Sequence, residues 1–211
     1  MPEAEPKARI APIAKSVQFY TKRNPNSYPH GLKLIHVFTM RSTCNISIVG
    51  CHAEGEVGDV IIGGVADVPP GTCATVHDKL LYFATKRDHI RKLLLNEPRG
   101  RSSMNVNLLL QPCDGRAAAG KLIMESTDSA PMSGSNTICT STVLLETGMV
   151  PMSEPVTKFS IDTAAGLVGI TAECDGGKCR SVSFDNVPAF VWQLDAAVDV
   201  SGLGTVKVDI A

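Results

Sequence analysis

Short apolar segments separated by turn residues make up most of the chain after residue 43. In the first of them, Ile46 and Ile48 alternate with polar positions, and this period of two is typical of a strand with one buried face. Gly-containing dipeptides and an Asp-Gly-Gly turn separate the later segments, as in β-hairpins. The pattern predicts strands over residues 44–50, 57–65, 106–110, 121–124, 157–162, 167–174 and 179–187.

A longer segment between the second and third strands has the period of an amphipathic helix. Leu80, Phe83, Ile90 and Leu94 recur at helical spacing, while a run of charged residues falls mostly on the other side. That run resembles a phosphate-binding patch, but charged residues are also usual on the solvated face of a surface helix. The spacing therefore predicts one continuous helix over residues 76–95, packed on the outside of the sheet.

The stretch from residue 130 to 148 has a different pattern. Pro131 disfavours a helical conformation just before it, and Ser133, Ser135 and Asn136 are side chains that cap helix N-termini well. Residues 138–145 are apolar or small on every side, and Gly148 follows as a natural end. Such a helix is enclosed rather than laid on a surface, although its Thr, Ser and Val residues are poor helix formers.

The start of this helix is a candidate anion site. The first N–H groups of a helix have no partner inside the helix, and the helix dipole favours negative charge there. A carboxylate is the ligand that we expect. If Gly134 and Ser135 bind it, their N–H groups should have no acceptor within the chain and should face a cleft.

Composition and charge exclude several other classes of protein. The net charge of −1 gives no basic field for nucleic acid or for an anionic membrane, and no apolar run reaches the roughly 20 residues of a membrane span. The seven cysteines are scattered without a Cys-x-x-Cys pair, which predicts neither a disulfide framework nor a zinc site and favours a reducing, cytoplasmic setting. No nucleotide-binding fingerprint is present, so no nucleotide cofactor is indicated.

Residues 1–42 differ from the rest of the chain. They hold five prolines, little apolar periodicity and more Lys and Arg than Glu. A targeting presequence is one interpretation, but the prolines and acidic residues disfavour it. We interpret the segment as a disordered extension or as a spurious start upstream of Met40.

Four ordered motifs resemble those of the proline racemase superfamily. The central one, PMSGSNTI at residues 131–138, is similar to the family's Pro-Met-Cys-Gly-His motif. The others are HAEGE at residues 52–56, NEPRG at 96–100 and VPAF at 187–190. Any one motif is weak, but four in the family's order are specific. In the HAEGE segment, His52 is a catalytic candidate, although a turn with internal hydrogen bonds explains it equally simply.

The resemblance implies a fold and a division into domains. It implies an α+β domain over residues 43–187, with an antiparallel sheet rolled around a central buried helix, as in one half of a diaminopimelate-epimerase-like protein. Residues 188–211 then correspond to the truncated start of a second domain. Members of the family need no cofactor, and no metal site is expected here. A homodimer is left open.

The resemblance also implies a chemistry. In the racemases of the family, each half presents one cysteine and one helix N-terminus to a proline-like substrate. Ser133 takes the place of the first cysteine, and Gly134, Ser135 and Asn136 take the substrate-binding positions. A hydroxyl is a far weaker acid or base than a thiol, so Ser133 suits chemistry with a single base. A plain helix cap is the alternative role of Ser133.

Three hypotheses for function follow. The first is dehydration of trans-3-hydroxy-L-proline, in which a base removes the α-proton and Ser133 assists the departing β-hydroxyl. The second is epimerisation of 4-hydroxyproline. The third is a catalytically dead fragment of the same family, because the second-half cysteine is missing from the 211 residues.

Overall fold

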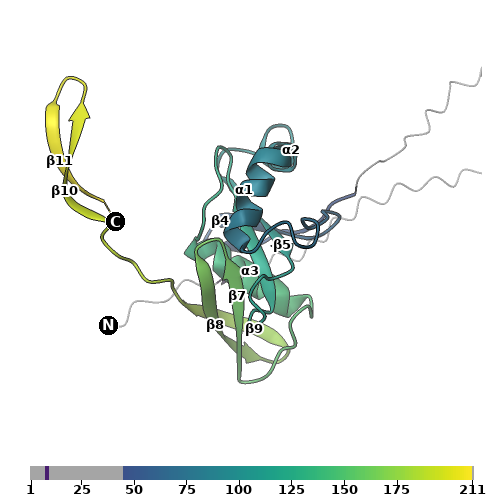
Figure 1. Ribbon diagram of the computed structural model, residues 1–211. Helices are drawn as coiled ribbons and strands as arrows, with labels where there is room; N and C mark the ends of the chain where they lie inside the picture. The colour runs from purple at the N-terminus through teal and green to yellow at the C-terminus, as the bar shows by residue number, and fades with distance from the viewer. Residues whose placement is uncertain (1–7, 10–44, 211) are drawn as a thin grey trace, which may run out of the picture.

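The computed structural model describes residues 8–9 and 45–210, whose strands form one large sheet and a separate hairpin (Figure 1). The predicted character of residues 1–42 lies outside the described residues, except for Ala8–Arg9, which pair with β3. The order across the sheet is β1-β3-β4-β5-β6-β7-β8-β9, with β2 also paired to β4. These strands are β1 (Ala8–Arg9), β2 (Ser47–Val49), β3 (His52–Ala53), β4 (Glu56–Gly63), β5 (Met104–Leu110), β6 (Ala119–Met124), β7 (Val156–Thr163), β8 (Gly166–Asp175) and β9 (Lys178–Asp185).

The sheet is mixed, whereas the sequence predicted antiparallel strands throughout. β4 pairs with β5 in parallel, and so does β6 with β7. A parallel pair needs a long crossover connection, and each of these two crossovers carries helical structure. The other pairings of the large sheet are antiparallel, and the predicted α+β class is confirmed.

The helix predicted over residues 76–95 is two helices, α1 (Val76–Lys86) and α2 (Asp88–Leu95). The start was predicted correctly, and a capping box between Thr75 and Asp78 fixes it. Arg87 breaks the helix with φ −134° and ψ 21°, and its guanidinium lies 5.3 Å from the ring centre of Phe83. The break lets the apolar side chains of both helices reach the same core cluster.

The third helix, α3 (Gly134–Glu146), is enclosed by the sheet as predicted. Ten of its thirteen residues are buried. It contacts β3 and β4 near one end of the strand order and β9 at the other, and β1 and β9 also contact each other. The sheet is therefore curled around α3, and packing holds together a helix whose composition is unfavourable.

The two faces of the sheet pack against different helices. On β5 and β6, Val106, Leu108, Leu122 and Met124 belong to the core cluster shared with α1 and α2. Alternate residues of the same strands point to the opposite face, toward α3. That inner face is only partly apolar, because it carries the polar side chains described below.

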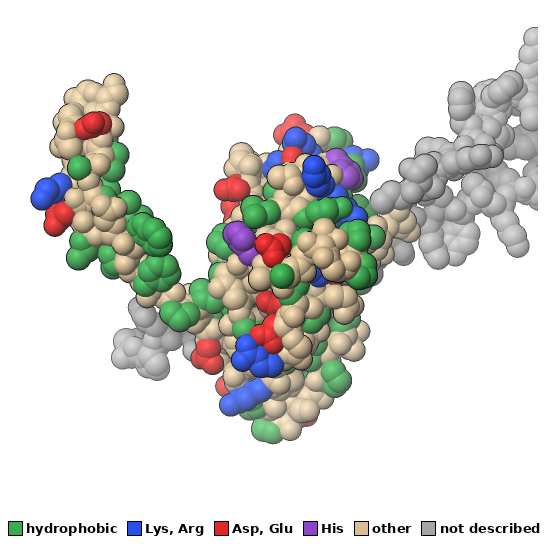
Figure 2. Space-filling view, in the orientation of Figure 1, with side chains coloured by type: hydrophobic (Ala, Val, Ile, Leu, Met, Phe, Trp, Pro, Cys, Tyr) green, Lys and Arg blue, Asp and Glu red, His purple; other side chains and the backbone are tan. Residues whose placement is uncertain are grey.

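A two-stranded hairpin follows the sheet. It comprises β10 (Gln193–Val200) and β11 (Gly204–Ile210) and stands clear of the large sheet in Figure 1. Figure 2 shows hydrophobic side chains along it. Trp192, just before β10, is 75% exposed, and Phe190, Val191, Leu194 and Leu203 are exposed as well. No helix in the described part of the chain is long and apolar enough to cross a membrane.

Candidate active site

The first turn of α3 positions the predicted site residues. Ser133 is the N-cap, with an extended backbone at φ −148° and ψ 135°. Its Oγ accepts hydrogen bonds from the backbone N–H of Asn136 at 3.5 Å and from Asn136 Nδ2 at 3.1 Å. Ser135 Oγ lies 3.1 Å from Ser133 Oγ. The structure thus brings the two hydroxyls and the helix start together.

The N–H groups of Gly134 and Ser135 have no acceptor among the described residues, as the sequence predicted. Four hollows of the described residues are all lined by residues other than Ser133, Gly134 and Ser135, so the expected cleft at the helix start stays a prediction. The ring of Phe184 on β9 lies over the helix start, 2.9 Å from where a Cβ on Gly134 would stand. A side chain at residue 134 would therefore have to displace this ring.

Asn136 was predicted to bind substrate, but its side chain lies behind Ser133. It is 1% exposed, and its Oδ1 accepts a hydrogen bond from Asn107 Nδ2 at 2.8 Å. With Nδ2 committed to Ser133 Oγ, both ends of the amide are occupied inside the protein. Gly58 leaves room for this amide, because a Cβ there would stand 3.0 Å from Asn136 Oδ1. The Asn136 side chain therefore supports Ser133 from inside the protein, and its role in binding substrate stays a prediction.

Two polar side chains on the inner face of the sheet were not predicted from the sequence to lie near the site. Asn107 on β5 is fully buried, and its Oδ1 has no partner among the described residues. Lys121 on β6 is 1% exposed, and its Nζ donates to Thr137 Oγ1 at 2.6 Å. Burial lowers the pKa of Lys121 to about 7. The alternation within each strand places both residues on the buried face, and that was the signal available in the sequence.

Ser133 Oγ has no basic or acidic side chain as a partner in the described residues. Its hydrogen-bond partners are Asn136 and Ser135. Lys121 reaches this turn only through Thr137, whose hydroxyl donates to the carbonyl oxygen of Ser133 at 2.7 Å. The serine is therefore a hydroxyl held in place rather than a nucleophile activated by a base.

Cys139, one turn further along α3, is also uncharged at neutral pH. Its hydrogen bond with Cys51 and its burial raise the pKa of Cys139 far above the ordinary value of a thiol. The same hydrogen bond lowers the pKa of Cys51, which is likewise buried. These thiols belong to the core beneath the helix start.

The other sequence candidates lie apart from this turn or have structural roles. His52 Nδ1 accepts the N–H of Gly55 at 3.2 Å, which closes the turn between β3 and β4. Arg99 is exposed in the turn after α2. No group of three metal-binding side chains occurs in the described residues. The turn at 52–56 is therefore a structural element of the sheet.

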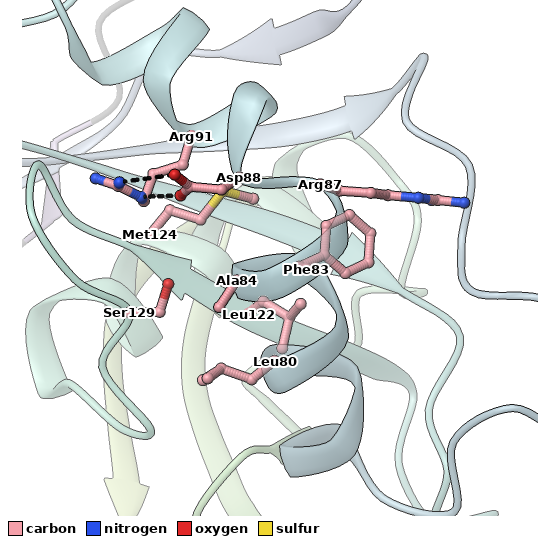
Figure 3. A pocket seen from close by; sticks show the side chains of 9 residues that line it. All are labelled: Leu80, Phe83, Ala84, Arg87, Asp88, Arg91, Leu122, Met124 and Ser129. Atoms are coloured by element: carbon pink, nitrogen blue, oxygen red, sulfur yellow. Dashed lines mark hydrogen bonds and ion pairs between the residues drawn. The ribbon is translucent and has the colours of Figure 1, made fainter.

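A small crevice between α1, α2 and β6 is also structural (Figure 3). Its volume is about 10 Å³, which is no more than a single water molecule needs. Figure 3 shows Arg91 paired with Asp88, and the same guanidinium donates to the carbonyl oxygens of Glu125 and Ser126. Arg91 thus holds the loop that leads from β6 to the start of α3.

These features define a class of domain, in which a curled α+β sheet encloses one helix whose first N–H groups have no acceptor among the described residues. Comparison with known sequences gives the family. The profile of the proline racemase family matches residues 48–211, and the chain belongs to this family.

Two solved structures resemble the chain closely. One is a probable proline racemase from Agrobacterium radiobacter K84 with bound carbonate, with 41% identity and a TM-score of 0.70 over 78% of this chain and 48% of that one. The other is a hydroxyproline epimerase from Agrobacterium vitis with bound trans-4-hydroxy-L-proline, with 41% identity and a TM-score of 0.71 over 81% of this chain and 49% of that one. The chain spans about half the length of these relatives.

Proposed function

We propose that this chain supplies the carboxylate-binding half of an enzyme that dehydrates trans-3-hydroxy-L-proline. The unpaired N–H groups of Gly134 and Ser135 would hold the substrate carboxylate at the positive end of the α3 dipole. Hydrogen bonds that strengthen as negative charge develops on that carboxylate would make the α-proton easier to remove.

The observation that supports dehydration is the hydrogen bonding of Ser133. Asn136 donates twice to Ser133 Oγ, so both lone pairs of the hydroxyl are engaged and its own proton, which faces Ser135 Oγ at 3.1 Å, is the group left to donate. A hydroxyl held in this way is a hydrogen-bond donor and a poor base. It suits a leaving hydroxyl group, which must gain a proton as its bond to carbon breaks.

The bond changes balance without a redox partner. The α C–H bond breaks, and its proton passes to a base supplied from outside the described residues. The electron pair forms the ring double bond, and the β C–O bond breaks. The departing hydroxide leaves as water after it gains a proton, with Ser133 donating a hydrogen bond to its oxygen.

Epimerisation of 4-hydroxyproline is the second candidate function. The observation that favours it is the 41% identity to a hydroxyproline epimerase with bound trans-4-hydroxy-L-proline. Epimerisation needs an acid and a base on opposite faces of the α-carbon, and Ser133 would have to serve as one of them. The absence of a basic partner for its Oγ in the described residues disfavours this role.

Product analysis distinguishes the candidates. The protein is incubated in deuterated water with trans-3-hydroxy-L-proline and, separately, with both 4-hydroxyproline epimers, and products are followed by proton magnetic resonance. Loss of the β-hydroxyl from the first substrate supports the proposal. Inversion of 4-hydroxyproline without dehydration establishes the second candidate instead. The assay is run on this chain and on one completed with the second half of the family fold, and no reaction of the completed chain supports the dead-fragment hypothesis.

A further inference from the structure

Lys121 is a buried lysine on the sheet face that encloses the proposed site. It lies on β6 opposite Leu109 of β5 and two positions before Ile123, so its side chain points toward α3. It is 1% exposed. A lysine is almost never buried to this degree without an ion pair, so its position needs an explanation.

The partners of Lys121 are unusually few. In the described residues, Thr137 Oγ1 is the acceptor of Nζ, and no carboxylate lies within ion-pair distance. The contrast is Lys79 on α1, which is also buried but bonds to both oxygens of Asp67 and to the carbonyl oxygen of Gln111. A protonated Lys121 carries three N–H donors, so it has unused capacity for a negative partner.

Lys121 is connected to the start of α3. Thr137 Oγ1 accepts from Lys121 Nζ at 2.6 Å and donates to the carbonyl oxygen of Ser133 at 2.7 Å. Two hydrogen bonds therefore separate the amine from the residue that precedes the free N–H groups of Gly134 and Ser135. We propose that Lys121 is the buried counter-charge of this anion site, so that binding of a carboxylate at the helix start draws a proton onto Lys121.

This inference rests on the proposed function, because it takes the helix start to be the carboxylate site. It adds a positioning residue that acts through Thr137 and through its charge, without touching substrate. Burial lowers the pKa of Lys121 to about 7, so the amine is poised between its two forms near neutral pH. A small change in the nearby charge is then enough to move it.

The other titratable groups on the elements around Lys121 do not supply a negative charge that would balance its amine. On α3, Cys139 is held uncharged by its hydrogen bond with Cys51 and by burial. On β4, burial raises the pKa of Asp59, and Glu56 is exposed and accepts a hydrogen bond from a β5 amide. On β7, the Asp162 carboxylate accepts two backbone N–H groups of a neighbouring loop. The charge of Lys121 is therefore unbalanced until an anion binds.

The size of the coupling is bounded by the effect of a nearby charge. An opposite charge close to an ionisable group moves its pKa by about 1–3 pH units, and the two intervening hydrogen bonds favour the lower part of that range. Binding and protonation are reciprocal, so the affinity for the carboxylate should fall by roughly 10- to 100-fold as the pH rises through the two pKa values of Lys121. The loss occurs at high pH because the neutral amine no longer attracts the anion.

The test uses the 211-residue chain labelled with carbon-13 at the lysine ε-carbons and nitrogen-15 at the backbone. The probe is trans-4-hydroxy-L-proline, and its uncharged carboxamide is the control ligand. The Lys121 resonance and the amides of Gly134 and Ser135 are followed from about pH 5.5 to about pH 9.5, a range that includes the starting and the raised pKa of Lys121. Lys121→Met removes the buried charge, and Lys158→Met removes one exposed charge from the neighbouring strand β7 as the matched control.

The inference predicts a Lys121 pKa that rises by about 1–2 pH units with the carboxylate and is unmoved by the carboxamide. The affinity should depend on pH in the parent and in Lys158→Met but not in Lys121→Met. If the amides of Gly134 and Ser135 respond to the probe while the pKa of Lys121 stays fixed, the inference fails and the anion site survives. If those amides do not respond at any pH, the anion site fails and the inference fails with it.

Discussion

Replacing Lys121 by Met should change how the stability of the fold depends on pH. The substitution keeps the length of the buried side chain and removes its amine. Burial lowers the pKa of Lys121 from 10.5 to about 7, so the unfolded chain binds one more proton than the folded protein between these two pH values. The free energy of unfolding therefore rises with pH across this window, and below about pH 7 the cost of the buried charge is complete.

The magnitude follows from the two pKa values. At about 1.36 kcal/mol per pH unit, the full window corresponds to roughly 5 kcal/mol. The parent should thus gain up to this amount relative to Lys121→Met between about pH 7 and 10. Loss of the hydrogen bond to Thr137 adds an offset of about 1 kcal/mol that does not depend on pH.

Urea unfolding of both proteins at several pH values measures the difference directly. Other titrating groups are common to both chains and cancel. Lys158→Met is the control, because it makes the same substitution at an exposed amine on the neighbouring strand. Parallel curves for the parent and Lys121→Met would refute the reasoning, since they would mean that Lys121 keeps an ordinary pKa in the folded protein.

Three further predictions concern the site and its surroundings. Gly58→Ala should lower the free energy of unfolding in urea by about 1–3 kcal/mol, because the new methyl group would stand 3.0 Å from both Asn136 Oδ1 and Cys139 Sγ. Unchanged stability would show that the neighbouring side chains move aside at no cost. In a protein completed with the second half of the family fold, Ser133→Ala should slow dehydration by about 10²–10⁴-fold in a product assay, while Ser133→Cys should raise α-proton exchange. Equal dehydration by the parent and by Ser133→Ala would show that the residue is only a helix cap. Trp192→Ser should reduce the concentration-dependent association of the chain in light scattering, because the 75% exposed indole lies in an apolar patch; association at the parent's level would place the contact elsewhere.

The sequence predicted those features that depend on local pattern. The enclosed character of α3 followed from residues 138–145, which lack a polar side wide enough to face water. Capping preferences indicated a start at Ser133, Ser135 or Asn136, and the structure places the cap at Ser133. The strands of the β7–β9 meander were predicted to within two residues at each end, because turns mark their limits.

Features that depend on tertiary packing were not predicted. The helical period continues through Arg87, whose side chain contacts the carbonyl oxygens of Ala66 and Asp67 and the rings of Tyr82 and Phe83 at the break. The parallel pairings depend on how crossovers pack, which periodicity does not reveal. In the sequence, Lys121 is one polar residue at the start of a predicted strand. Its burial was not predicted, because it depends on packing against α3, which follows later in the chain.

The curled sheet also dictates when the proposed site comes into existence. Because α3 is enclosed between β3 and β4 on one side and β9 on the other, the backbone amides of its buried residues 136–145 can reach solvent only when those strands separate. Hydrogen exchange at α3 should therefore proceed by global opening, whereas the β10–β11 hairpin should exchange through local opening. The helix contacts segments that are far away along the chain, so its N-terminus is assembled only after the last strand of the sheet has docked.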